Sequence, residues 1–186
     1  MTTALVEKRK FTPAPVKPMN PILKKVIRGF EARIRRAPTN VDGKDFPVKH
    51  SFAEGVYIRE IFMAKNMVIV GHLHRDSYYN IMVSGDISCL TENGIKRMTG
   101  ANQSIAPPLT KRFGYTHEDT VWQTVHPNPD NITDIDALEK MIIIEEPLPI
   151  ENKQCNKLLN LFLMNIFFPE GHGSIPYKRR TVCQQQ

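Results

Sequence analysis

The sequence predicts an all-β protein, a small antiparallel barrel with a basic arm before it and an apolar extension after it. Between residues 51 and 144, short apolar runs are separated by turn residues such as Gly85 and the pair Asn93-Gly94, a pattern typical of barrels and sandwiches. Residues 1–50 hold 12 Lys and Arg against 4 Asp and Glu, so the basic excess lies in the arm. The most apolar run, residues 158–168, follows the last predicted strand.

The length of 186 residues suits one domain with extensions. We place the arm at residues 1–46, the barrel at residues 47–147 and the extension at residues 148–186. The first residues run directly into charged ones without an apolar segment, so no signal peptide is expected. Three dispersed cysteines form no CxxC pair, which predicts reduced thiols in a cytosolic setting.

The arm is predicted to be extended at first and then helical. Its prolines between residues 13 and 21 exclude regular pairing there, and Asn20-Pro21 is a good helix start. Ala37-Pro38 ends the helix, which we expect over about residues 21–36. One face is apolar and much of the rest is basic. Docking on protein is favoured because the apolar face needs burial, while nucleic acid and an anionic membrane surface remain alternative partners.

The barrel is predicted from short runs that are rich in β-forming residues. These runs are residues 55–63, 67–74, 79–83, 87–91, 95–98, 103–106 and 120–126. Asn93-Gly94 supplies the positive φ angles of a tight hairpin. Residues 134–140 are expected to form a helical turn, and residues 141–144 either helix or strand.

Some of these residues resemble the two motifs of the cupin family. They are the pair His72 and His74, the glycine turn at Gly85 that follows Tyr78 by seven residues, and the later turn at Pro107-Pro108. The resemblance implies a cupin-like jelly-roll barrel. In cupins the first motif supplies two histidines and a glutamate, and the second supplies another histidine, to a divalent metal inside the barrel.

A second resemblance covers residues 110–115, 118–122 and the pair His126-Pro127. This part is similar to small cupin-like proteins that are encoded in phage genomes. With the cupin motifs, the resemblance covers about half of the chain. It implies no particular activity.

The predicted metal site departs from the cupin pattern. His72 and His74 match the first two ligands, and both point to the same face if they lie on one strand. The glutamate position falls on Tyr78 or Tyr79, neither of which is a carboxylate. The expectation is a barrel that has lost most of its ligands and has no cofactor, with a divalent metal on His72 and His74 as the alternative.

The second motif departs as well. Its turn glycine is Leu109 here, and its histidine position falls on Arg112. An arginine adds a permanent positive charge, which opposes a divalent cation. Asp76, His117 or His126 would have to complete a metal site through folding.

A ligand pocket is the other candidate site. Lys111 and Arg112, with Tyr115 and Tyr78, could bind an anionic or sugar ligand, because arginine pairs well with carboxylate or phosphate. The competing interpretation of the Lys-Arg pair is a solvated turn, and it is the favoured one.

The apolar run at residues 158–168 is too short to span a bilayer. We expect it to be buried on protein, either at an oligomeric interface or on its own barrel. Together with the basic arm, this favours a non-catalytic phage structural or assembly protein, which contacts further copies of itself or other virion proteins, in the virion or the host cytoplasm. The alternative is a metal-dependent cupin enzyme, a dioxygenase or sugar isomerase, that uses His72 and His74. A nucleic-acid-binding module built on residues 8–36 is the third reading.

Overall fold

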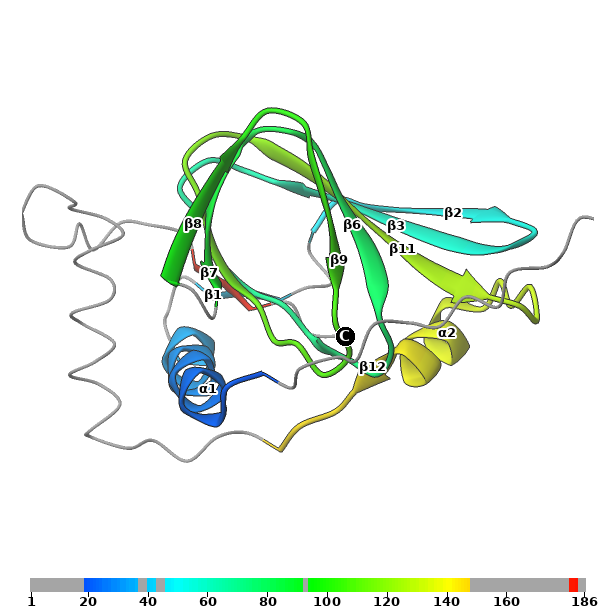
Figure 1. Ribbon diagram of the computed structural model, residues 1–186, viewed down its shortest axis with the longest axis horizontal. Coiled ribbons are helices and arrows are strands. Elements are labelled where there is room, and N and C mark those ends of the chain that lie inside the picture. Colours follow the sequence, from blue (N-terminus) through cyan, green and yellow to red (C-terminus); the bar gives the residue numbers. More distant parts are fainter. Residues whose placement is uncertain (1–18, 37–39, 43–45, 92–93, 148–180, 184–186) are drawn as a thin grey trace, which may run out of the picture.

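The computed structural model describes residues 19–36, 40–42, 46–91, 94–147 and 181–183. Within these ranges the fold has two large sheets that face each other and a small third sheet of two strands (Figure 1). The helices are α1 (Pro21–Arg35) and α2 (Ile135–Ile142). The strands are β1 (Asn40–Asp42), β2 (Val48–Ala53), β3 (Gly55–Met63), β4 (Val68–Val70), β5 (Leu73–His74), β6 (Tyr78–Ser84), β7 (Asp86–Thr91), β8 (Gly94–Thr99), β9 (Asn102–Ala106), β10 (Phe113–Thr116), β11 (Thr120–Asn128), β12 (Ile143–Ile144) and β13 (Thr181–Cys183).

The strand order is that of a jelly roll. One sheet, called sheet A, has the order β1-β13-β4-β10-β7-β8, and the other, sheet B, has the order β2-β3-β11-β6-β9. From β3 to β11 the chain crosses repeatedly between the sheets, and the pairs are antiparallel. A jelly roll packs two such sheets face to face. The predicted antiparallel jelly roll is therefore confirmed in a mostly-β chain with two helices, and its two sheets face each other without closing into a barrel.

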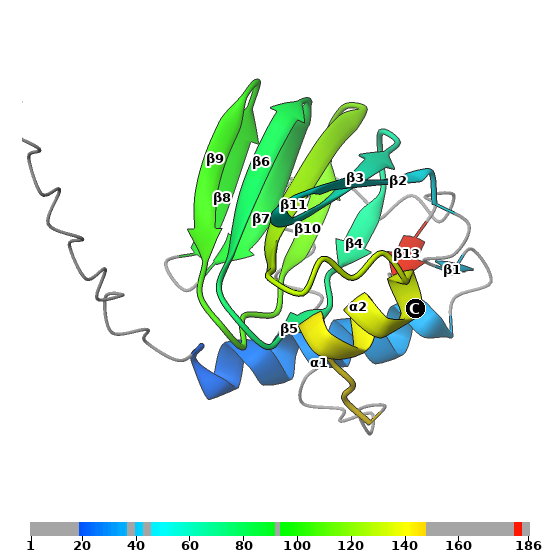
Figure 2. The ribbon, with the colours of Figure 1, turned by 90° about the vertical axis from the view of Figure 1, so that its right-hand side faces the viewer.

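Helix α1 is the basic amphipathic helix expected from the sequence. The Asn20 side chain accepts a hydrogen bond from the Ile22 N–H at 2.9 Å, and Pro21 opens the first turn. The buried face of α1 packs on the outer side of sheet A, where the Phe30 and Phe113 rings have centroids 4.4 Å apart. Figure 2 shows α1 along the lower ends of the strands, with α2 beside it. The helix thus docks on its own sheet.

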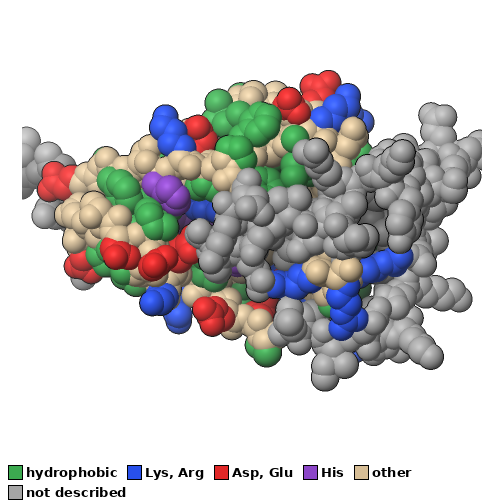
Figure 3. Space-filling model, turned by 180° about the vertical axis from the view of Figure 1, so that it is seen from behind, with side chains coloured by type: hydrophobic (Ala, Val, Ile, Leu, Met, Phe, Trp, Pro, Cys, Tyr) green, Lys and Arg blue, Asp and Glu red, His purple; other side chains and the backbone are tan. Residues whose placement is uncertain are grey.

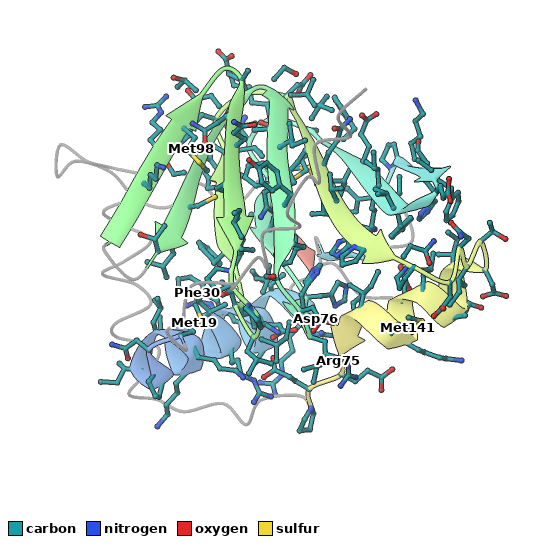
Figure 4. The ribbon with its side chains drawn as sticks, turned by 45° about the vertical axis from the view of Figure 1, so that its right-hand side comes forward. Met19, Phe30, Arg75, Asp76, Met98 and Met141 are labelled. Atoms are coloured by element: carbon teal, nitrogen blue, oxygen red, sulfur yellow. The ribbon has the colours of Figure 1, made fainter. Side chains whose placement is uncertain are left out.

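The space between the sheets holds a second apolar cluster. Its buried members are Phe46, Ile61, Met63, Met67, Ile69, Met82, Ile87, Cys89 and Met98. In Figure 4, Met98 lies toward one end of the sheets, whereas Phe30 lies on α1 at the other end. The cluster therefore reaches the end of the sheets that is remote from α1.

Several predicted boundaries change. The predicted strand 67–74 is broken, because Gly71 and His72 separate β4 from β5. Strand β10 was not predicted from the sequence. Strand β13 lies in the predicted C-terminal extension, where it pairs in parallel with β4.

The apolar run at residues 158–168 lies outside the described residues. No helix in the described part of the chain is long and apolar enough to cross a membrane.

Candidate functional site

A cavity of about 100 Å³ lies between the two sheets at the end that faces the helices. Its apolar part is lined by Ile61, Met63, Ile69, Ile87, Cys89 and Trp122. Its polar part is lined by Tyr57, Arg59, His72, His74, Tyr78, Asn80, Arg112, Thr124, His126 and Glu139. One apolar side and a few polar groups are the usual composition of a small-molecule site.

Sheet B presents the cavity with three cross-strand rows of side chains. Strand alternation points every second residue inward, and the register of β3, β11 and β6 sets the neighbours. The ring row is Tyr57 and His126, with Tyr78 stacked on His126. The donor row is Arg59, Thr124 and Asn80. The apolar row is Ile61, Trp122 and Met82.

The imidazoles of the cavity belong to a stack of rings. The His74 centroid lies 4.0 Å from that of Tyr78 and 5.1 Å from that of His126. Burial lowers the pKa of His74 to about 2, and nearby positive charge adds to this effect. Burial, with Arg59 nearby, lowers the pKa of His72 and that of His126 to about 4. These imidazoles are therefore neutral at pH 7.

The two guanidiniums of the cavity are the unusual feature. Arg59 and Arg112 both line it, and within the described ranges neither side chain forms a hydrogen bond or an ion pair. Burial lowers the pKa of Arg59, while Tyr57 and Glu139 oppose that shift. The Arg112 guanidinium carbon lies 6.0 Å from the centroid of the Trp122 ring. Glu139 is the one acidic side chain among the cavity-lining residues that the structure describes.

The structure separates the four residues that the sequence grouped as a ligand pocket. Tyr78 and Arg112 line the cavity, but Lys111 and Tyr115 do not. Lys111 is only 4% exposed, and its Nζ lies 2.7 Å from Glu31 and 3.0 Å from Glu146. Tyr115 packs in the α1 cluster and donates a hydrogen bond to Asn66 at 2.8 Å. The grouping of Lys111 and Tyr115 with the ligand site is wrong, and so is the solvated turn for Lys111.

The ion pairs of Lys111 belong to a larger cluster at the base of sheet A. Glu31 also pairs with Arg35 at 2.7 Å, and Glu146 also pairs with Lys24 at 3.0 Å. Burial raises the pKa of both carboxyl groups, but hydrogen bonds and the positive charges outweigh burial, so each pKa lies below its usual value. The cluster ties α1 to the chain that follows β12. Its role is structural.

The cavity does not fit a divalent metal. His72 and His74 both line it, and the buried His74 Nδ1 has no hydrogen-bond partner. However, no group of three or more His, Cys, Asp or Glu side chains among the described residues is placed to hold a metal ion. Arg59 and Arg112 add positive charge to the same space, which opposes a cation. Asp76 is exposed, and His117 instead shares a hydrogen bond with Ser88 at 2.7 Å.

The turn before β10 holds the two residues at which the sequence departs from the second cupin motif, Leu109 and Arg112. Leu109 has φ of 59°, a left-handed conformation that is costly for leucine and easy for glycine. This is the position at which the cupin pattern has glycine. Arg112, at the histidine position of that pattern, does point into the cavity. The turn therefore supplies a guanidinium, and not an imidazole, to the cavity.

No protein-family model matches the chain, and a search of curated proteins finds no match. Among solved structures, a cupin-2 domain protein from Shewanella frigidimarina is 6% identical, covers 44% of this chain and 79% of its own, and has a TM-score of 0.37. An RmlC-like cupin from Methanocaldococcus jannaschii is 17% identical over 47% of this chain and 84% of its own, with a TM-score of 0.39.

A third solved structure is the cupin-2 domain of an XRE family transcriptional regulator from Enterobacter cloacae. It is 10% identical, covers 45% of this chain and 98% of its own, and has a TM-score of 0.38. The jelly-roll assignment of this chain follows from the strand order of its two sheets.

Several cavity residues were not predicted as site residues, among them Arg59, Asn80, Thr124 and Trp122. A signal for Arg59 was present, because it shares a strand face with Tyr57 and Ile61, which are both buried. The opposite face of β3 carries Ile58 and Phe62, so apolar pattern alone did not tell which face points inward. The register between strands, which places Thr124 and Asn80 beside Arg59, has no local signal.

The space-filling view from behind shows the surface around this region (Figure 3). Apolar side chains lie at the upper edge of this face and also among the histidine, acidic and basic side chains on its left.

Proposed function

We propose that this protein is a binding module that takes up a small organic anion between its two sheets. The observation that carries the proposal is the pair of guanidiniums, Arg59 and Arg112, that line one cavity without an ion-pair partner among the described side chains. Both side chains are half-buried, and a charge that is partly removed from water without a partner is costly. An anionic ligand would remove that cost, so the unpaired charges favour a site that is completed by a ligand.

The charges of the cavity support an anion over a cation or a neutral molecule. Two guanidiniums face one carboxylate, that of Glu139, and the imidazoles are neutral at pH 7. The polar part of the cavity therefore carries a net positive charge. Arginine is also the side chain best suited to carboxylate and phosphate, because its planar fork donates two parallel hydrogen bonds.

The chain provides its own reporter for the test. Trp122 is the single tryptophan of the sequence, and it lines the cavity near Arg112. We use benzoate as the probe. We expect the fluorescence of Trp122 to change as benzoate is added and to reach a plateau when the site is full. Arg112→Gln and Arg59→Gln should each weaken the binding about tenfold or more, since each removes a charged hydrogen-bond donor.

The matched control is Arg75→Gln. Arg75 is exposed, and it donates a hydrogen bond to the Met141 carbonyl outside the cavity. The Arg75→Gln variant should therefore bind benzoate with the affinity of the wild type. Absence of saturable binding to the wild type, or equal losses in the Arg75 and Arg112 variants, would contradict the proposal.

A second function, assembly, is favoured by the outer face of sheet B. Four large apolar side chains are exposed there: Ile105 at 65%, Val83 at 45%, Phe62 at 40% and Tyr79 at 39%. Tyr79 and Ile105 are direct cross-strand neighbours, and Val121 lies opposite Phe62. Gln123 and Glu60 lie between these two groups and are hydrogen-bonded to each other. Exposed apolar side chains gathered on one sheet face are typical of protein interaction sites.

We infer that the occupant of this face is a second copy of the chain. The other candidate is the chain's own C-terminal extension. Its flanks, however, attach elsewhere, because the Pro147 carbonyl accepts a hydrogen bond from Arg28 on α1, and β13 pairs with β4 in sheet A. Two copies that bury the same face against each other form an isologous dimer.

Analytical ultracentrifugation tests the dimer. Val83→Lys with Ile105→Lys should convert it to monomer, because each lysine places a charge in an apolar interface. Ile95→Lys, on sheet A, changes another exposed apolar side chain (40%) and should leave the dimer intact. A monomeric wild type, or equal dissociation by Ile95→Lys, would contradict the dimer.

The predicted place of such an assembly in a phage particle has its own test. Mass spectrometry of purified virions should find the chain in several copies per particle, and its absence from the particles would contradict a virion role. The metal-enzyme alternative stays a prediction. Near-stoichiometric iron, manganese, nickel or zinc that is lost in His74→Ala would support it.

A further inference from the structure

The donor row of sheet B, Arg59, Thr124 and Asn80, lies in the cavity beside the apolar row that contains Trp122. We propose that the ligand is a monocarboxylate with one small apolar group, whose carboxylate lies on the donor row and whose apolar group lies against Trp122. This proposal rests on the anion-binding function and names its ligand class. It places the ligand on sheet B, away from His72.

Asn80 gives the first independent support for a carboxylate at the donor row. It is 1% exposed, and its Oδ1 accepts a hydrogen bond from the Trp122 Nε1–H at 3.1 Å. Because the indole nitrogen only donates, this bond fixes which end of the amide is oxygen. The Nδ2 end is then a buried donor, and it has no partner. A buried donor without an acceptor is rare and costly, so this one indicates a missing acceptor.

Arg59 and Thr124 supply two further donors beside Asn80 in the same cross-strand row. Thr124 pairs with Arg59 on one side and with Asn80 on the other. Neighbours of this kind have Cβ atoms about 4.5–5.5 Å apart, so their polar ends can meet at one small group. Within the described ranges, the Thr124 hydroxyl makes no hydrogen bond. A carboxylate has about four acceptor positions, which suits three adjacent donors.

Charge selects a monoanion. The lining holds two guanidiniums and the Glu139 carboxylate, a balance of one positive charge when the imidazoles are neutral. A monocarboxylate brings that balance to zero, whereas a phosphate dianion would leave an excess of negative charge in the buried space. We therefore favour a carboxylate over a phosphate ester.

Size and shape limit the apolar group. The row next to the donors is Ile61, Trp122 and Met82, and the last of these is 1% exposed. The indole offers a flat face to a ring or a branched chain. The cavity of about 100 Å³ is smaller than the roughly 150 Å³ apolar cavity known to hold benzene. The apolar group is therefore no larger than about one ring.

Isothermal titration calorimetry with three matched probes tests the ligand class. The probes are benzoate, its neutral isostere benzamide, and phenyl phosphate. We expect benzoate to bind at least about tenfold more tightly than either of the others. Tighter binding of phenyl phosphate would overturn the carboxylate, and tighter or equal binding of benzamide would overturn the anion.

Two variants test the position of the carboxylate. Thr124→Val is isosteric and removes only the hydroxyl, and it should weaken benzoate about tenfold. Asn80→Asp keeps the acceptor for Trp122 but removes the donor and adds a negative charge, so it should weaken benzoate more. Thr99→Val, an exposed threonine on β8, is the control and should bind as the wild type does.

The outcomes distinguish a failure of the donor-row inference from a failure of the proposed anion binding. If benzoate does not bind the wild type, anion binding itself fails. If benzoate binds and depends on Arg112 but Thr124→Val has the affinity of the wild type, the donor row is overturned while anion binding stands. Because Asn80 is buried and its variant can lose the fold, thermal unfolding by circular dichroism is measured first, and the isosteric Thr124 variant decides.

Discussion

Lys111 and Arg112 are neighbours in the sequence, yet they serve opposite sides of sheet A. Lys111 points to the base, where it is almost fully buried between Glu31 and Glu146. Arg112 points into the cavity, where no described side chain pairs with it. One cation is neutralised by the fold, and the other is left for a ligand. The comparison teaches that a buried charge with partners in the fold has a structural role, whereas a half-buried charge that lines a cavity without a partner indicates a binding role.

The largest effect on stability is expected from Lys111→Met. The change leaves two buried carboxylates with only their more exposed partners, Lys24, Arg28 and Arg35. Breaking a buried pair costs about 3–5 kcal/mol, and the remaining partners place the loss near the lower end, at about 3 kcal/mol. Urea unfolding measures it. A loss below about 1 kcal/mol would show that the base cluster does not hold α1.

The next effect concerns pH and the cavity. The pKa of His126 is about 4 in the folded protein and about 6.5 when unfolded. The unfolded state therefore takes up a proton first as the pH falls, so stability decreases from about pH 6.5 toward pH 4. Between pH 7.5 and pH 5 this amounts to about 2 kcal/mol for His126. His126→Gln should flatten the dependence by that amount in urea unfolding, and an unchanged slope would contradict it.

A smaller effect is expected at the edge of the base cluster. Arg35 pairs with Glu31 one turn earlier on α1, and it is more exposed than Lys111. Glu31 keeps Lys111 when Arg35 is lost, so Arg35→Met should cost only about 0.5–1 kcal/mol. Thermal unfolding of Arg35→Met and of Lys111→Met gives the ratio of their two stability losses. Equal costs for the two variants would mean that burial does not set the strength of these pairs.

The smallest effect on stability is expected from Arg112→Met. It replaces an unpaired charge by an apolar side chain of similar length, so the folded protein should be unchanged or slightly more stable. Benzoate binding, in contrast, should be lost. Urea unfolding with calorimetry on the same sample measures both. Strong destabilisation would show that Arg112 is a structural residue like Lys111, and the comparison would fail.

Local patterns predicted much of the fold. Helix α1 begins at the Asn20-Pro21 signal, and β3 spans the predicted residues 55–63, because capping and strand preference act over a few residues. Strand β10 was missed because Gly114 interrupts its pattern. That glycine has a packing reason, since a Cβ there would lie 3.0 Å from Ile87.

The site was predictable only in part. Tyr78 and Arg112 were named from motif positions, and both line the cavity. The direction of a side chain next to a turn is set by the whole sheet, so the sequence could not separate Lys111 from Arg112. The partners of Lys111 lie at residues 31 and 146, and contacts over such distances leave no local pattern.

The base cluster also has a consequence for the order of synthesis. Glu31 leaves the ribosome 115 residues before Glu146, although both must meet Lys111. At ~5–20 residues per second, α1 waits roughly 6–23 s for the last member of its anchor. The sheet residues that cover Ile27, Phe30 and Ile34 lie between Val68 and Tyr115, so they are made within that interval. The apolar face of α1 can therefore dock before the ion pairs that anchor the helix are complete.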